Sequence, residues 1–328
     1  MTLHCMVVRC VLAAMLAALC ATAQAQQWPS KPVTMVVAAA AGGPIDVFAR
    51  IMAERIGPIL GQRVQVQNAG GSGGIMGGQR VAKAKPDGYT TLLGTVATHA
   101  NPQLHVAKPP YNPVGDFAPV ALIAEIPLVL VARKNLPANT FEEFVAYAKK
   151  NQAGMTYGSA GVGSASHLGC VMLQRAMGVT IRHLPYRGTA PAMEDLIAGQ
   201  LDFLCEIAVT AVPNIKAGSV KALANLSGRR SAVLPDLPTA GEKGLPSVEA
   251  YTWAALFAPK GTPAPIVAKL QAATAAAMDT PGLREQLNGL AATLVAPERR
   301  SSDYLGRFVK SEFDKWGEAI RAGGALPK

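Results

Sequence analysis

The chain has 328 residues, of which 50% are hydrophobic, and it carries a formal net charge of +10 at pH 7. Its basic residues are scattered, often in pairs such as Lys149-Lys150 and Arg299-Arg300, without a basic stripe that carries aromatic residues. This pattern excludes nucleic acid as an expected partner, and the charge fits either attraction of small anions or an ordinary solvated surface. The chain is longer than one hydrophobic core usually serves, so we expect two domains.

The first residues predict export. Arg9 precedes an apolar run over residues 11–19, and Ala23-Gln24-Ala25 follows. A short apolar core that ends in small residues is typical of a secretory signal peptide. The run is shorter than the roughly 20 apolar residues that a membrane-spanning helix needs. We therefore predict a signal peptide over residues 1–25, with cleavage after Ala25.

Beyond the signal peptide, apolar β-type runs alternate with segments of helical period, which predicts an α/β fold with mostly parallel sheets. The run Val33 to Ala38 predicts the first buried strand. Apolar residues spaced on one helical face predict a helix that Gly57-Pro58 ends or kinks. The next expected elements are a strand over 64–67, a glycine-rich segment over 69–78, a strand over 90–94 and a helix that Thr140 caps.

Neither a long linker nor an internal repeat separates the two expected domains. Domains without a linker are usually joined by strands that cross between them. The apolar runs 127–132 and 251–258 are our candidates for these crossings. We therefore expect one lobe to comprise residues 26–127 plus 251–328, and the second lobe to comprise residues 128–250.

Cysteine usage is low. Three of the five cysteines lie within the predicted signal peptide, which leaves Cys170 and Cys205. An exported chain can oxidise such a pair, but we expect two buried free thiols. A lipid anchor at Cys20 is the alternative to cleavage after Ala25, and Leu19 disfavours it because a lipoprotein signal has a small residue there.

Three loops follow predicted strands, and in open α/β sheets ligands bind beyond the carboxyl ends of strands. The loop over 41–46 contains Gly42 and Gly43 and precedes a helix, whose first amides favour an anion. The loop over 157–167 adds serine hydroxyls to such amides and lacks the lysine of a Walker motif. The third loop covers 94–99. The first loop, taken alone, is equally compatible with an ordinary turn between a strand and a helix, with Asp46 as a first-turn cap.

One segment offers an enzymatic alternative. Gly70-Gly71-Ser72-Gly73-Gly74 matches the nucleophile elbow of serine hydrolases, and Asp87 or Asp116 with His167 or His183 would complete the order Ser, Asp, His. Short matches arise easily in a glycine-rich segment, so we expect no enzyme and keep the hydrolase as the alternative. The histidines are not spaced as a metal site, so we expect neither a metal nor a cofactor.

An ordered series of motifs resembles the Bug, or tripartite tricarboxylate transporter (TctC-type), family of substrate-binding proteins. The resemblance covers nearly the whole chain after residue 25. Its motifs are Trp28 to Val33, Gly42-Gly43 to Asp46, Lys85 to Thr90, Asp116 to Val120, Tyr157 to Gly161 with Ser166-His167, Pro185 to Gly188, Leu234 to Thr239 and Phe257 to Pro259.

The resemblance implies a two-lobed, type II periplasmic-binding-protein-like fold, with two mixed sheets flanked by helices around a ligand cleft. It implies a periplasmic, non-enzymatic protein, which we expect to be a monomer, that captures a small organic carboxylate by closing its lobes and delivers it to integral-membrane transporter subunits. Carried onto this chain residue by residue, the ligand-binding set is Gly42, Gly43, Asp46, Thr95, Thr98, Ser159, Ser164, Ser166, Tyr186 and Glu206.

Departures from the family pattern occur at the expected site. Ala38 to Ala41 stand where prolines are common, Pro44-Ile45 replace small and hydroxyl residues, and Leu204 to Ile207 replace a stretch with aspartate and asparagine. These changes predict a more apolar pocket and suggest a longer or aromatic carboxylate. Two roles stay open: Arg187 either meets a second ligand carboxylate or is solvated, and His167 either orients a loop hydroxyl or is structural.

Overall fold

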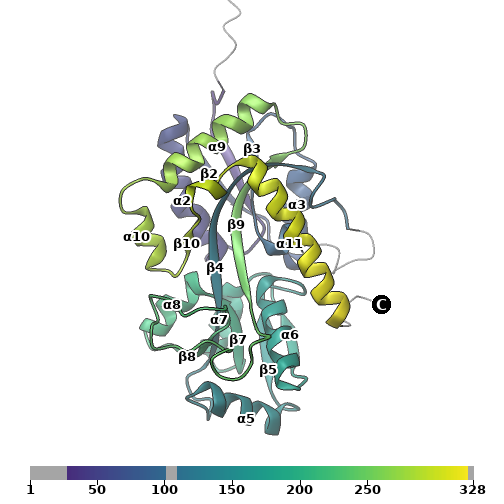
Figure 1. Cartoon of the computed structure of the whole chain (residues 1–328), viewed down its shortest axis with the longest axis vertical. Coiled ribbons are helices and arrows are strands. Elements are labelled where there is room, and N and C mark those ends of the chain that lie inside the picture. Colours follow the sequence, from purple (N-terminus) through teal and green to yellow (C-terminus); the bar gives the residue numbers. More distant parts are fainter. Residues whose placement is uncertain (1–27, 101–108, 324–328) are drawn as a thin grey trace, which may run out of the picture.

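The computed structural model describes residues 28–100 and 109–323 of the chain. The predicted signal peptide lies outside these residues. The described part is a mixed α/β structure whose helices cover a curled sheet, as predicted (Figure 1). Within it, we find no helix that combines the length and apolar character needed to cross a bilayer.

The upper half of the molecule in Figure 1 is built on a parallel core of three strands. Strand β1 (Val33–Val37) pairs with β2 (Val64–Asn68) on one side and with β3 (Thr90–Gly94) on the other. The helices and short strand of this half are α2 (Pro44–Leu60), η1 (Ser72–Gly74), α3 (Ile75–Ala82), α4 (Val96–His99), α9 (Ala264–Met278), α10 (Leu283–Asn288), β10 (Thr293–Leu294), η3 (Pro297–Arg299) and α11 (Ser302–Gly323).

Helix α2 shows how the sequence positions one wall of the later site. Its apolar stripe, which includes Phe48 and Met52, is fully buried against the sheet. We predicted that Gly57-Pro58 would end or kink this helix, and the helix instead continues to Leu60. Gly61 then ends it in a left-handed conformation (φ 72°) that suits glycine. Pro58 has no amide hydrogen, so it removes one hydrogen bond from the last turn of the helix.

The lower half in Figure 1 contains a second group of strands with its own helices. Strand β5 (Thr156–Ser159) pairs in parallel with β6 (Arg182–Pro185) and with β7 (Phe203–Ile207). The remaining elements of this half are β8 (Val220–Asn225), α5 (Phe141–Asn151), α6 (Ala165–Met177), α7 (Thr189–Ile197) and α8 (Ala208–Lys216). Thr140 caps α5 by accepting a hydrogen bond from the Glu143 amide at 3.1 Å, as its sequence predicted.

One long strand runs through both halves, and a second pairs with its upper part. Strand β4 (Phe117–Arg133) pairs antiparallel with β9 (Tyr251–Pro259) as far as Pro127 opposite Tyr251. From Leu128 onward, β4 pairs with β7 and β8 of the lower half. The two runs that we selected as crossings lie in these strands. The connection between the halves therefore consists of paired, buried β-structure.

The two remaining cysteines form a disulfide. Cys170 on α6 is bonded to Cys205 on β7, with their Cα atoms 5.5 Å apart, within the normal range for such bonds. The expectation of two free thiols was therefore wrong, because packing of α6 on β7 brings two residues that are far apart in the sequence next to each other. The bond fastens α6 to the sheet of the lower half.

Candidate functional site

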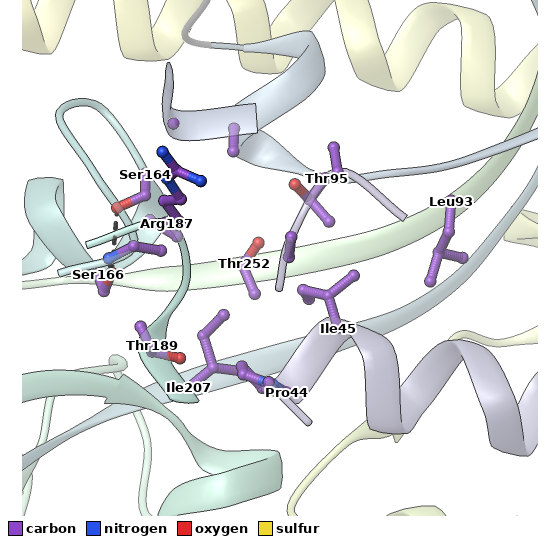
Figure 2. A pocket seen from close by; sticks show the side chains of 17 residues that line it. Pro44, Ile45, Leu93, Thr95, Ser164, Ser166, Arg187, Thr189, Ile207 and Thr252 are labelled. Atoms are coloured by element: carbon purple, nitrogen blue, oxygen red, sulfur yellow. Dashed lines mark hydrogen bonds between the residues drawn. The ribbon is translucent and has the colours of Figure 1, made fainter. Parts of the chain in front are cut away.

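A cavity of about 50 Å³ lies where the two halves meet (Figure 2). Its upper wall comes from the segments that follow β1 and β3, and its lower wall from the starts of α6 and α7. Strand β9 contributes Thr252. The lining residues are Ala38, Ala39, Gly43, Pro44, Ile45, Gly73, Leu93, Thr95, Ala97, Ala160, Ser164, Ala165, Ser166, Arg187, Thr189, Ile207 and Thr252.

The amino terminus of α2 faces this cavity. Gly43 is the N-cap residue, and Pro44 and Ile45 begin the helix. The amides of Ile45 and Asp46 have no acceptor among the described residues. Unpaired amides at the start of a 17-residue helix carry partial positive charge, which favours an anion.

Gly42 and Asp46 stabilise this helix start from behind, and neither lines the cavity. The Asp46 carboxylate accepts hydrogen bonds from the Gly42 amide at 2.9 Å, from Arg50 at 3.0 Å and from Asn68 at 2.9 Å. Burial opposes ionisation, but the hydrogen bonds from Arg50, Gly42 and Asn68 hold the pKa of Asp46 below its usual value. These bonds occupy the carboxylate oxygens of Asp46, and its negative charge would repel an anionic ligand. Both features fit a structural role.

The lower half presents a second helix start, at α6. Ser164 is its N-cap residue, and the amides of Ala165 and Ser166 have no acceptor among the described residues. The Ser164 hydroxyl donates to the Gly161 carbonyl at 2.7 Å and lies 3.1 Å from the Ser166 hydroxyl. These bonds fix both serines at the cavity wall, where Figure 2 shows them together.

Ser159 lies beneath the α6 loop and does not line the cavity. It is fully buried, and its hydroxyl lies 2.7 Å from Nε2 of His183 and donates to the Gly161 carbonyl at 3.1 Å. Burial lowers the pKa of His183 to about 4, which keeps this pair neutral. His167, whose role the sequence left open, accepts a hydrogen bond from the Gly163 amide at 3.0 Å and so supports the same loop.

In the upper half, Thr95 lines the cavity and Thr98 lies behind it. The Thr98 hydroxyl accepts a hydrogen bond from the Thr95 amide at 2.9 Å and lies 2.8 Å from Nδ1 of His99. Thr98 thus positions the backbone on which Thr95 stands. Figure 2 shows the Thr95 hydroxyl on the side that faces the lower half.

Tyr186 and Glu206 also lie outside the cavity lining. The Tyr186 hydroxyl donates to Asp195 of α7 at 2.5 Å. Glu206 is fully buried, and its Oε1 accepts from Thr189 at 2.9 Å and from Thr210 at 2.6 Å. Burial, opposed by the hydrogen bonds from Thr210 and Thr189, raises the pKa of Glu206 to about 7. Glu206 therefore reaches the cavity only through Thr189.

Three lining residues with polar side chains were not in the predicted set: Arg187, Thr189 and Thr252. Arg187 is exposed, and its guanidinium has no acceptor among the described residues. Thr189 follows directly on the motif that ends at Gly188. Thr252 is the residue that interrupts an otherwise apolar run, and this interruption was the available signal.

The halves approach each other closely around the cavity, and glycines make the approach possible. A Cβ atom on Gly188 would lie 2.5 Å from the Cβ of Ala40 in the opposite half. One on Gly70 would lie 2.9 Å from the Arg187 carbonyl oxygen. Both distances are far below van der Waals contact, so the two walls touch through backbone at these positions.

The geometry does not support the hydrolase alternative. Ser72 is exposed, with φ at 49°, and forms no hydrogen bond with a histidine among the described residues. His183 lies against Ser159 and His167 against the α6 loop, so neither acts as a base for Ser72. Over residues 28–100 and 109–323, no group of three or more His, Cys, Asp or Glu side chains gathers as a metal site.

Comparison with known proteins agrees with this geometry. A family model described as "Tripartite tricarboxylate transporter family receptor" matches residues 48–325. A UPF0065 protein from the ttuE-ttuC' intergenic region of Agrobacterium vitis is 43% identical over 305 residues, which span 92% of this chain and 87% of the relative.

Two solved structures are also similar. The periplasmic binding protein BugD is 39% identical with a TM-score of 0.89, over 92% of this chain and 100% of that structure. MatC from Rhodopseudomonas palustris, solved with bound malate, is 40% identical with a TM-score of 0.86, over 89% of this chain and 100% of that structure. The chain therefore belongs to the tripartite tricarboxylate transporter receptor (TctC, or Bug) family of periplasmic solute-binding proteins, which are not enzymes.

Proposed function

We propose that this protein captures a small carboxylate in the periplasm by closing its two halves, and that it delivers the ligand to membrane subunits of a tripartite transporter. One observation carries the proposal: α2 and α6 begin in opposite halves and direct unpaired amides into the same cavity. An anion placed there bridges the halves and stabilises the closed form over the open one. We further propose export through residues 1–25, with cleavage after Ala25, and action as a monomer.

The moving bodies that we propose are residues 26–127 plus 251–328 and residues 128–250. The pairing of β4 supports this division, because its partner changes from β9 to β7 and β8 between Pro127 and Leu128. Rotation at this point changes few side-chain contacts within either half. It separates the walls that meet at Gly188 and Ala40.

Within the predicted residue set, we assign direct contact to Gly43, Thr95, Ser164 and Ser166, which line the cavity. We add Arg187 and Thr189 to these. The other six predicted residues, which lie behind the lining, hold the first group in place: Gly42, Asp46, Thr98, Ser159, Tyr186 and Glu206.

The ligand that we propose is a short organic acid. A cavity of about 50 Å³ accommodates only a few water-sized groups, each of which needs about 10–15 Å³ on this measure. The malate bound by MatC supports a short acid, although malate has more non-hydrogen atoms than this cavity holds water-sized groups, so the cleft must widen somewhat to admit it. The apolar lining does suit a carbon chain, but a longer or aromatic acid would require a wider cleft than the structure shows.

The number of available donors is sufficient for useful affinity. A micromolar Kd corresponds to about −8 kcal/mol. Hydrogen bonds to a charged group contribute about 1.5–3 kcal/mol each. Four unpaired amides at two helix starts together with Arg187 would contribute about 7.5–15 kcal/mol in sum, a range that includes the required total.

The test is binding of malate, succinate and adipate, first by thermal shift and then by calorimetry. A ligand that binds only the folded protein raises its melting temperature by mass action. Succinamide and adipamide serve as uncharged controls for succinate and adipate. Binding of an acid but not of its amide is expected; absence of binding by every acid would refute the proposal.

A matched pair of variants tests direct contact. Arg187→Gln should raise the Kd about tenfold, the effect of one exposed charge-assisted hydrogen bond, and leave the melting temperature of the empty protein unchanged. Arg182→Gln removes the same charge from an exposed residue that does not line the cavity, and should bind as the wild type does. Equal weakening in both variants would show a long-range charge effect and contradict the assignment.

A further inference from the structure

Thr252 carries an unsatisfied polar group at the cavity. Five buried side-chain polar atoms lack a hydrogen-bond partner among the described residues, and only the Thr252 hydroxyl belongs to a residue that lines the cavity. Thr252 is fully buried. A buried hydroxyl without a partner lowers stability, and valine would fill the same volume without that cost.

The strand geometry explains why this hydroxyl faces the cavity. Side chains alternate between the two faces of a strand. The neighbours of Thr252 on β9, Tyr251 and Trp253, both donate to the Glu312 carboxylate of α11, at 2.8 and 3.1 Å. Thr252 therefore points to the opposite face. Figure 2 shows its hydroxyl on the side where Thr95 of the upper half and Arg187 of the lower half lie.

The position of Thr252 differs from that of every other polar lining residue. It pairs with Ile126, one residue before the pair of Pro127 and Tyr251 at which β4 changes partners. It thus stands at the end of β9 that is nearest the proposed boundary between the halves, whereas Thr95, Ser164 and Thr189 follow or precede elements within one half.

We infer that Thr252 is a ligand-binding residue, whose hydroxyl donates a hydrogen bond to an acceptor oxygen of the bound carboxylate from the floor of the cleft. The inference rests on the proposed function of the cavity. The ligand supplies the hydrogen-bond acceptor that the Thr252 hydroxyl lacks. The unsatisfied hydroxyl lowers the stability of the empty protein, and ligand binding removes that cost.

The test compares Thr252→Val with Thr252→Ser, using malate, succinate and adipate as probes. Thr252→Val keeps the shape and removes the hydroxyl, so it should raise the Kd about tenfold or more, equivalent to about 1.4 kcal/mol. Thr252→Ser keeps the hydroxyl and should bind within about threefold of the wild type, a factor worth about 0.6 kcal/mol. The empty Thr252→Val protein should melt at the wild-type temperature or above it.

Each outcome decides one point. If no acid raises the melting temperature of the wild type, the proposed function itself fails. If an acid binds the wild type and Thr252→Val alike, the function stands and the role of Thr252 is refuted. Equal weakening in the serine and valine variants would assign the effect to packing and also overturn the inference. A lower melting temperature of the empty Thr252→Val protein would show that the hydroxyl serves the fold.

Discussion

Replacing Gly188 with alanine should hold the cleft open. Gly188 is buried just before α7 and has an extended backbone (φ 171°), which any residue can adopt. The added methyl group would lie 2.5 Å from the Cβ and 3.0 Å from the amide nitrogen of Ala40, in the opposite half. Since ordinary contacts begin near 3.4 Å, the walls must separate by roughly 1 Å.

The expected loss of affinity follows from the free-energy cost of overpacking, which is about 1–3 kcal/mol. This cost applies to the closed form alone, because the two groups part when the cleft opens. Ligand binding must overcome it, so the Kd of Gly188→Ala should rise about 5- to 150-fold. The free energy of unfolding should change little, because the halves can relax apart.

Calorimetry with malate gives the affinity, and small-angle X-ray scattering gives the radius of gyration with and without ligand. Gly154→Ala is the matched control, since its nearest neighbour would be the Asn151 carbonyl oxygen at 3.8 Å and it lies away from the cleft. Wild-type affinity together with a wild-type radius in Gly188→Ala would refute the reasoning, because it would mean that the contact with Ala40 does not open and close.

Two further predictions concern stability. Burial raises the pKa of Glu206 to about 7 from a usual 4.5, and a carboxyl shifted in this direction favours the folded state below pH 4.5 and loses that contribution as the pH rises through about 7. Urea unfolding should therefore show the wild type losing about 3 kcal/mol relative to Glu206→Gln across this window; a difference that is constant with pH would contradict the assignment. The disulfide between Cys170 and Cys205 closes a loop with a sequence separation of 35, so its reduction should lower the free energy of unfolding by about 4 kcal/mol. An unchanged melting temperature in dithiothreitol would show that the bond adds no stability.

The sequence located the loops of the site better than it assigned the residues within them. The loop glycines and the small-residue run after β5 signalled helix starts, and both helix starts face the cavity. Within these loops, the direction of each side chain depends on packing. Ser159 and Ser166 belong to the same motif, yet Ser159 turns toward His183 and Ser166 toward the cavity.

From the sequence alone, residues that support the site cannot be distinguished from residues that bind the ligand. Asp46 and Glu206 are polar residues in family motifs, and only their hydrogen bonds to Asn68 and Thr189 show that they lie behind the lining. Thr252 shows the reverse case: the mostly apolar run over 251–258 predicted a crossing strand, and Thr252 lies outside the three loops that the sequence predicted as ligand-binding. Strand periodicity shows that Thr252 faces away from Tyr251 and Trp253, but it does not show which face is toward the cavity. That depends on the hydrogen bonds of Tyr251 and Trp253 to α11.

A crystal structure with the best-binding acid tests the central claim most directly. The account predicts carboxylate oxygens about 3 Å from the amide nitrogens of both Ile45 and Ala165, so that the ligand joins the start of α2 in one half to the start of α6 in the other. A ligand that contacts only one of these helix starts, or that binds outside the cavity, would contradict it.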